Sequence, residues 1–279
     1  MTGAAIVAGV VGAPVTHSLS PLIHGAWLAA AGIDGAYVPF RPPQTGFERL
    51  VDGLRGGAVR GLNVTVPFKE RALALADTVD ASAQAAGAAN LLLFADDGSL
   101  EARNTDGLGL LAALAEQAPH WSPSAAPVVI LGAGGAAQGA AAALAGAELR
   151  IVNRSRERAE ALAARVGGRV FGWDAIAEAL DGAALVVNAT TRGLNGVEPL
   201  DLRWPSPLPG AAAMDMVYSP LRTAFLDGAA TAGWATVDGL AMLIGQARPS
   251  FEAFYGRPPP EEVDVRALCL AELARRAAA

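Results

Sequence analysis

Lys69 is the side chain whose type and position most suggest acid–base chemistry. The chain has 21 basic residues, of which Lys69 is the one lysine and the other 20 are arginines. A lysine can lose its proton near neutral pH when it is desolvated or close to other charges, whereas a guanidinium stays charged. Residues 64–69 (VTVPFK) predict a strand end followed by a helix that starts at Lys69, where the helix dipole disfavours the charged amine.

Asp106, in residues 104–107 (NTDG), is the candidate partner of Lys69. A carboxylate that opposes the amine would orient it and tune its protonation. We therefore predict that Lys69 is a general acid and base and that Asp106 assists it. Two alternatives remain open, namely that one lysine persists by chance and that Asp106 only caps a helix.

Two serines near the N-terminus, in residues 15–21 (VTHSLSP), predict a site for a carboxylate. Ser20 suits an N-cap and Pro21 suits the first helical turn. Capping leaves Ser18 unexplained. Because hydroxyls and free N–H groups would meet at a helix N-terminus, we expect Ser18 and Ser20 to bind an anionic group there.

A glycine-rich turn follows the apolar residues 128–131 (VVIL) and opens an alanine-rich helix. The pattern GAGGAA at 132–137 matches G-x-G-x-x-G/A, in which the glycines allow a tight turn and close approach of a pyrophosphate to the backbone. Ala137 would let the helix pack on the strand. A glycine-rich turn without a ligand is the alternative. The residues assigned to cofactor binding in this turn are Gly132, Ala133, Gly134, Gly135 and Ala136.

The end of the next predicted strand favours NADP over NAD. An acidic residue there would bind a ribose 2′-hydroxyl and repel a 2′-phosphate, but the sequence continues as NRSRER at 153–158. Arg156 is better explained as a solvated side chain that pairs with a glutamate of the same helix. A later strand runs into residues 188–191 (NATT), at the edge where such sheets bind ligands. The further cofactor residues predicted from these two segments are Asn153, Arg154, Ser155, Arg158 and Thr190.

The elements that must position these residues form two α/β domains. Strand-like and helix-like segments alternate through the first hundred residues, and an Asp-Gly turn at 97–98 predicts a hairpin. We predict an α/β substrate domain with a mixed sheet at 1–105, a connecting helix and proline-rich linker at 106–127 with the linker proper at 118–127, and a Rossmann-type domain at 128–237. We also expect C-terminal helices at 238–279 that return to the first domain.

Composition excludes several functions. The 279 residues carry a formal charge of −6, which argues against a nucleic-acid partner because phosphate binding needs clustered positive charge. The charge-free run at 117–147 is interrupted by prolines and glycines, so we expect no membrane span. Cys269 is the one cysteine, too few for an internal disulfide, and we read it as a core residue. Histidines are too sparse for a metal site, and the N-terminus lacks the basic region of a secretory signal, which suggests a cytoplasmic protein.

Nine motifs, in order, resemble the shikimate dehydrogenase family. They are HSLSP, NVTVPFK, GAAN, NTDG, GAGGA, NRSRER, NAT, DMVYSPLRTAFL and GLAMLIGQARPSFEAFYG, and together they cover nearly the whole chain. The resemblance implies NADPH-dependent, reversible reduction of 3-dehydroshikimate to shikimate, a step of aromatic amino acid and chorismate biosynthesis. It also implies roles for individual residues: Ser18, Ser20, Tyr218 and Gln246 around the substrate carboxylate, Thr65, Asn90 and Asp106 at the ring hydroxyls beside Lys69, and Met216 and Gly239 at the nicotinamide.

Alternatives remain within and outside this family. Leu91 stands where the family often has threonine, which removes a hydroxyl near the substrate site. Gln138 stands where arginine is common, which removes a cation near the cofactor phosphates, so a weaker preference for NADP is expected. A quinate/shikimate dehydrogenase, or a paralogue that acts on a related cyclic hydroxy acid with NAD, is the alternative enzyme. A non-catalytic NADP-binding regulator is the alternative outside enzymes. The sequence leaves both a monomer and a homodimer open.

Overall fold

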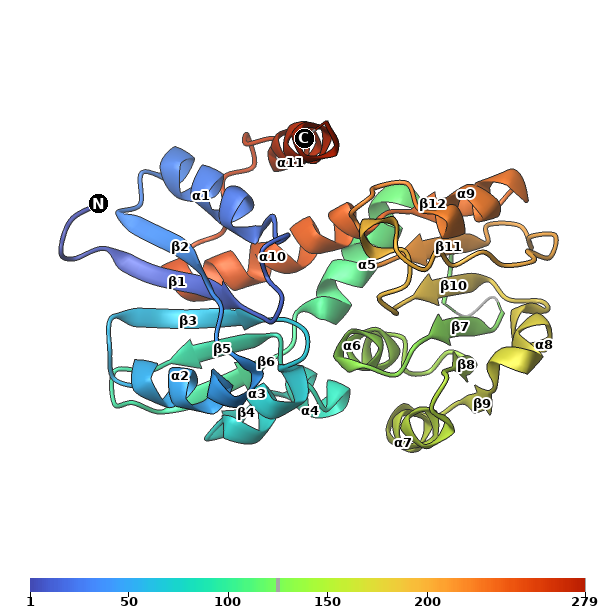
Figure 1. Cartoon of the computed structure of the whole chain (residues 1–279), viewed down its shortest axis with the longest axis horizontal. Helices are drawn as coiled ribbons and strands as arrows, with labels where there is room; N and C mark the ends of the chain where they lie inside the picture. Colours follow the sequence, from blue (N-terminus) through green and yellow to red (C-terminus); the bar gives the residue numbers. More distant parts are fainter. Residues whose placement is uncertain (124–125, 279) are drawn as a thin grey trace. The chain divides into compact units, whose positions relative to one another are not determined.

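The computed structural model describes residues 1–123 and 126–278 and divides into two units (Figure 1). Unit 1 comprises residues 1–105 and the chain from residue 246 onward, and unit 2 comprises residues 106–245. Residues 124 and 125 of the predicted linker, and residue 279 of the predicted C-terminal segment, lie outside the described residues. Each unit has its own sheet, which confirms the predicted α/β class.

Unit 1 contains a mixed six-stranded sheet in the order β2-β1-β3-β5-β6-β4. Strand β1 pairs in parallel with β2 and β3, whereas β5 runs antiparallel to both β3 and β6. The hairpin predicted around residues 97–98 joins β5 to β6. The elements of this unit are β1 (Ile6–Val11), α1 (Ser20–Ala31), β2 (Gly35–Phe40), a 3₁₀ turn (Gln44–Gly46), α2 (Phe47–Leu54), β3 (Val59–Val64), α3 (Lys69–Leu75), β4 (Thr78–Val79), α4 (Ala81–Ala86), β5 (Leu91–Phe94), β6 (Leu100–Arg103) and α11 (Val265–Ala277).

Side-chain alternation along β3 separates the two faces of this sheet. Leu62 and Val64 point into a core that α2 and α3 cover, with Phe47 and Phe68 stacked at 4.4 Å between ring centroids. Successive residues of a strand face opposite sides, so Gly61 and Asn63 face the other layer. That layer includes α1 and the C-terminal part of α10 (Gly239–Tyr255), and a Cβ on Gly61 would lie 2.5 Å from the Phe254 ring.

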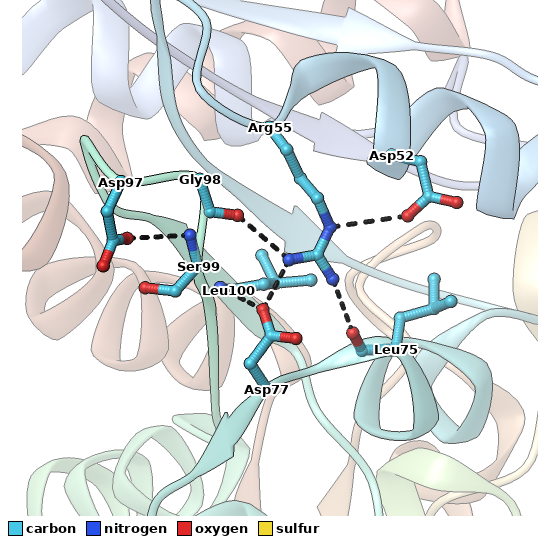
Figure 2. Close-up of polar contacts among 8 residues, drawn as sticks. All are labelled: Asp52, Arg55, Leu75, Asp77, Asp97, Gly98, Ser99 and Leu100. Carbon is cyan, nitrogen blue, oxygen red and sulfur yellow. Dashed lines mark hydrogen bonds and ion pairs between the residues drawn. The ribbon is translucent and has the colours of Figure 1, made fainter.

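Arg55 follows the last residue of α2, and its side chain hydrogen-bonds to the end of α3, to Asp77 and to the β5–β6 hairpin (Figure 2). Its guanidinium donates to Asp77 Oδ2 at 2.5 Å, to the Leu75 carbonyl at 2.8 Å and to the Gly98 carbonyl at 3.1 Å. The same Asp77 oxygen accepts the Leu100 N–H at 2.8 Å. The hydrogen bond from Arg55 lowers the pKa of Asp77. These bonds hold the end of α3 and the β5–β6 hairpin together near the edge of the sheet where β3 begins.

Unit 2 is a doubly wound parallel sheet in the order β12-β11-β10-β7-β8-β9. Counted along the chain, this is the order 3-2-1-4-5-6 of dinucleotide-binding folds. The elements are α5 (Asp106–Gln117), β7 (Val128–Leu131), α6 (Gly135–Ala143), β8 (Leu149–Val152), α7 (Arg156–Val166), β9 (Arg169–Phe171), a 3₁₀ turn (Trp173–Ala175), α8 (Ile176–Leu180), β10 (Leu185–Asn188), a 3₁₀ turn (Leu194–Gly196), β11 (Ala212–Asp215), α9 (Ala224–Thr231) and β12 (Ala235–Val237).

Helices cover both faces of this parallel sheet, which explains why its strands read as continuous apolar runs. Along β7, Val128 and Ile130 pack with α5 and α6 in one core, while Val129 and Leu131 pack with α8 and α9 in the other. Helix α6 approaches its strand closely because Ala137 is fully buried, as the sequence predicts. Among the described residues, no helix combines the length and the hydrophobicity that a bilayer span requires.

The C-terminal helices complete unit 1. Tyr255 on α10 donates to the Ala36 carbonyl at 3.1 Å, Arg257 donates to the Ala31 carbonyl, and Arg276 on α11 donates to the His17 carbonyl at 2.8 Å. Through these bonds the end of the chain packs on its first part. Cys269 is fully buried on α11, as predicted, and burial raises the pKa of its thiol to about 11.

Candidate active site

Lys69 is the first residue of α3, as the sequence predicts, and it is only 9% exposed. Its carbonyl accepts the Ala89 N–H at 2.9 Å, which brings the chain segment that ends in Asn90 alongside the start of α3. Asn90 precedes β5 and is 3% exposed. The buried Asn90 therefore follows directly on a segment that is hydrogen-bonded to the backbone of Lys69.

Asn90, Thr105 and Gln246 form one hydrogen-bonded cluster. The Thr105 N–H donates to Asn90 Oδ1 at 2.7 Å, and Asn90 Nδ2 donates to Thr105 Oγ1 at 3.0 Å and to Gln246 Oε1 at 3.3 Å. The Thr105 hydroxyl also lies 3.3 Å from Gln246 Oε1. The structure thus brings together two of the predicted substrate residues, which are 156 positions apart in sequence.

Ser18 and Ser20 lie at the start of α1, but their capping roles differ from the prediction. The N-cap is Leu19, Ser20 is the first helical residue, and Ser18 Oγ accepts the Ser20 N–H at 3.2 Å. The assignment of Ser20 as a side-chain cap is therefore wrong. The physical reason is that the helix begins one residue earlier than a Ser20 cap requires, so that Leu19, which has no polar side chain, occupies the cap position.

Thr65 follows β3 in the turn that leads to Lys69. Its N–H donates to the Val11 carbonyl and its carbonyl accepts the Phe68 N–H, both at 3.0 Å. A Cβ on Gly12 would lie 2.4 Å from Thr65 Cγ2, so that glycine makes room for the threonine. The side chain is half-buried at the end of the strand.

Sequence reasoning missed three buried polar residues of unit 1, namely Tyr37, Asn63 and Ser250. Tyr37 donates to Asn63 Oδ1 at 2.8 Å, and Asn63 Nδ2 donates to Ser250 Oγ at 2.8 Å. Burial raises the pKa of the Tyr37 phenol well above its usual value, so this hydroxyl stays neutral. The available signal was the polar Asn63 and Ser250 within apolar segments, but nothing in the sequence paired them.

The glycine-rich turn of unit 2 has the geometry that pyrophosphate binding requires. Gly132 has φ +114°, a value that disfavours any side chain, and a Cβ there would lie 3.1 Å from the Ala189 carbonyl oxygen and 3.3 Å from Thr190 Cγ2. Gly134 is the N-cap of α6 and has no side chain that could cap the helix. A Cβ on it would meet nothing within 4 Å. The open helix N-terminus therefore fits a dinucleotide phosphate, and Thr190 lies beside it.

The arginines after β8 are exposed at the start of α7. Arg156 pairs with Glu160 at 2.7 Å, which confirms it as a solvated helix-face residue. Arg154 and Arg158 are also exposed. Asn153 turns its amide back on the chain, with Nδ2 donating to the Ser155 carbonyl at 2.8 Å. This bond shapes the turn that presents the two other arginines.

Asp215 and Asn188 are further polar residues in the core of unit 2. Asn188 Oδ1 accepts the Thr190 N–H at 3.1 Å and the Thr190 hydroxyl at 2.7 Å. Asp215 accepts from the Val217 N–H at 2.9 Å and from the Thr223 hydroxyl at 2.6 Å. Burial nevertheless raises the pKa of Asp215 to about 6. The sequence analysis overlooked Asp215, although a charged residue that ends an apolar strand is a usable signal.

The structure places Met216 and Gly239 together within unit 2. A Cβ on Gly239 would lie 2.6 Å from the Met216 carbonyl oxygen, so only glycine allows α10 to begin this close to the backbone after β11. Tyr218 is half-buried in the same segment.

Asp106 begins α5 and is 5% exposed. No group of three potential ligands for a metal ion occurs in the described ranges 1–123 and 126–278.

The doubly wound unit and its open glycine turn define a dinucleotide-binding protein, and the polar site of the other unit is suited to a small hydroxylated molecule. Two family models match the chain: shikimate dehydrogenase substrate binding domain over residues 10–92, and shikimate / quinate 5-dehydrogenase over residues 113–198. The first match lies within unit 1 and the second within unit 2.

Similar proteins share the whole length of the chain. The shikimate dehydrogenase (NADP(+)) of Caulobacter vibrioides is 58% identical and covers 97% of this chain, which in turn covers 96% of that relative. The crystal structure of shikimate 5-dehydrogenase from Thermus thermophilus in complex with NADP(H) and shikimate is 37% identical, with a TM-score of 0.81 and coverage of 98% and 99% of the two chains. Quinate dehydrogenase from Corynebacterium glutamicum in complex with NAD is 29% identical, with a TM-score of 0.81 and coverage of 92% and 95%.

The chain belongs to the shikimate dehydrogenase family. This confirms the family, the two-sheet fold and the class of oxidoreductase predicted from the nine motifs. The NADP(+) in the relative's name agrees with the cofactor that the sequence favours.

Proposed function

We propose that this protein catalyses the reversible, NADPH-dependent reduction of 3-dehydroshikimate to shikimate. The observation that carries the proposal is the buried polar cluster of Asn90, Thr105 and Gln246 beside the backbone of Lys69. A ring that carries several hydroxyls needs such fixed donors and acceptors, because a site built to bond a hydroxyl discriminates strongly for it. Ser18, Ser20, Tyr218 and Gln246 bind the carboxylate region of the substrate, while Thr65, Asn90 and Asp106 bind the ring hydroxyls.

Lys69 moves the proton in this reaction. Bound NADPH supplies the hydride that reduces the substrate carbonyl carbon. In the reduction, the protonated Lys69 amine stabilises the negative charge that develops on the carbonyl oxygen and donates a proton to it. In the oxidation of shikimate, the neutral amine accepts the proton of the reacting hydroxyl. Asp106 orients the amine in both directions.

Unit 2 binds the cofactor. The N–H groups of residues 132–136 and the N-terminus of α6 hold the pyrophosphate, with Thr190 beside the turn. Arg154 and Arg158, with Asn153 and Ser155, bind the 2′-phosphate through charge-assisted hydrogen bonds. Met216 and Gly239 bind the nicotinamide. Residues 1–105 and 128–237 are the corresponding substrate and cofactor domains, joined by residues 106–127, and residues 238–279 return to the first. We place this protein in the cytoplasm as a monomer or homodimer.

The role of Lys69 is tested by its replacement with methionine, which keeps the length of the side chain without the amine. We expect Lys69→Met to lower the kcat of shikimate oxidation at least about 100-fold, as loss of a general acid–base group does, with little change in KM. Glu70→Gln, on the adjacent exposed residue of α3, is the matched control and keeps its kcat. A Lys69→Met enzyme with the kcat of the parent would remove this lysine from the mechanism.

Oxidation of quinate with NAD is the second candidate. It is favoured by the match to the shikimate / quinate 5-dehydrogenase model and by the similarity to the Corynebacterium glutamicum structure. Two residues also depart from the usual family pattern, since Leu91 replaces a threonine and Gln138 replaces an arginine. A regulator without activity is disfavoured because both Lys69 and Asp106 are present and buried. Turnover of shikimate, even without an assay on quinate, is enough to distinguish both enzymes from the regulator.

A further inference from the structure

Three buried side chains of unit 1, those of Tyr37, Asn63 and Ser250, form a continuous hydrogen-bonded chain that ends at the backbone carbonyl of Gln246. Tyr37 donates to Asn63 Oδ1 at 2.8 Å, Asn63 Nδ2 donates to Ser250 Oγ at 2.8 Å, and Ser250 Oγ donates to the Gln246 carbonyl at 3.1 Å. Gln246 is in the proposed substrate site, whereas Tyr37, Asn63 and Ser250 were assigned no role.

The direction of every hydrogen bond in this chain is fixed. Asn63 Nδ2 also lies 3.3 Å from the Asn90 carbonyl oxygen, which can only accept. A flipped amide would place two acceptors against each other, so Asn63 must turn its oxygen to Tyr37 and its nitrogen to Ser250. Ser250 accepts from Asn63 and therefore has its single proton left for the Gln246 carbonyl. Fully satisfied buried networks of this kind hold their members in one arrangement.

The chain bears on both proposed substrate-binding amides. Asn63 bonds to the backbone of Asn90, and Ser250 bonds to the backbone of Gln246. The Thr105 N–H donates to Asn90 Oδ1, and the Thr105 hydroxyl lies 3.5 Å from Ser250 Oγ. The Gln246 oxygen points toward Asn90 and Thr105, so its Nε2 donor is directed away from this cluster.

We infer that Tyr37, Asn63 and Ser250 are positioning residues for substrate binding, which set the place and orientation of Asn90 and Gln246. This inference rests on the proposed function. The three residues act through the amides that contact the substrate, and they touch neither the substrate nor the reacting atoms. Loss of one link therefore weakens binding of the substrate and leaves the proton transfer by Lys69 in place.

Ser250→Ala tests the link to Gln246. Loss of one oriented hydrogen bond is expected to raise the KM for shikimate about 5- to 10-fold with kcat within about twofold of the parent. Gln246→Ala raises this KM as well. If Ser250 acts through Gln246, the double variant has a KM within about twofold of Gln246→Ala, whereas independent effects would multiply.

Tyr37→Phe and Tyr255→Phe form a matched pair. Both hydroxyls belong to buried tyrosines that are 7% exposed, but Tyr255 bonds to the Ala36 carbonyl, outside this hydrogen-bonded chain. Tyr37→Phe is expected to raise the KM for shikimate several-fold, and Tyr255→Phe to leave it unchanged, at similar losses of thermal stability.

Equal KM values for the two tyrosine variants would overturn the inference. It would also be overturned if the KM effects of the Ser250 and Gln246 substitutions multiply in the double variant. If the parent binds no shikimate, the proposed function fails and this inference with it; if the parent is active and the variants match it, only the inference fails.

Discussion

Asn188 and Asp215 lie opposite each other at the carboxyl ends of β10 and β11, and Asn188 Nδ2 donates to Asp215 Oδ1 at 2.9 Å. The pair joins the loop that contains Thr190 to the segment that begins with Met216. Both are fully buried. The two predicted cofactor-binding segments are therefore anchored to the sheet by one buried carboxylate and one amide.

Asp215 gives folding stability a pH dependence of known sign. Burial raises its pKa from 3.8 to about 6 in the folded protein. The folded state thus binds the proton more tightly, so the contribution is fully present below pH 3.8 and is lost as the pH rises through 6, by at most about 1.4 kcal/mol per unit. Asp215→Asn loses one acceptor but does not titrate. We expect urea unfolding to show a smaller destabilisation by Asp215→Asn at about pH 7 than at about pH 4; an equal or larger one at the higher pH would contradict this account.

His24 gives folding stability a pH dependence of the opposite sign. Its ring stacks on Tyr37 at 3.9 Å between centroids, and neither nitrogen has a hydrogen-bond partner among the described residues. Burial lowers its pKa from 6.5 to about 3. The folded state therefore needs the neutral ring, and its stability is lost as the pH falls from 6.5 toward 3, by at most about 1.4 kcal/mol per unit.

His24→Phe keeps a ring in the stack and removes the titration. We expect the difference in unfolding free energy between the variant and the parent to shift in favour of the variant as the pH falls from about 7 to about 4.5. The exposed His120, changed to glutamine, is the control and shows no such shift. A pH-independent difference for His24→Phe would mean that this histidine is not neutral in the folded protein.

Arg154 and Arg158 should determine the preference for NADP. Removal of a guanidinium that bonds the 2′-phosphate costs about 1.5 to 3 kcal/mol, so Arg154→Ala should raise the KM for NADP roughly 10- to 100-fold. The KM for NAD should hardly change, because NAD lacks that phosphate. Arg156→Ala is the control, since Arg156 pairs with Glu160. Parallel increases in KM for both cofactors would place Arg154 away from the 2′-phosphate.

Local patterns were sufficient to predict the elements that carry the site. The glycine turn, the start of α3 at Lys69 and the β5–β6 hairpin each depend on a few adjacent residues, and the structure has them all. The role of Ser20 was misjudged because α1 begins one residue earlier than the local cap pattern predicts. Asn63 and Ser250 are 187 positions apart, and no local pattern can pair them.

The most direct measurement is the oxidation of shikimate and of quinate by the purified protein, each with NADP and with NAD, followed by the absorbance of the reduced nicotinamide. We predict the highest kcat/KM for shikimate with NADP. The highest value for quinate with NAD, or no turnover in any of the four combinations, would contradict the proposed function.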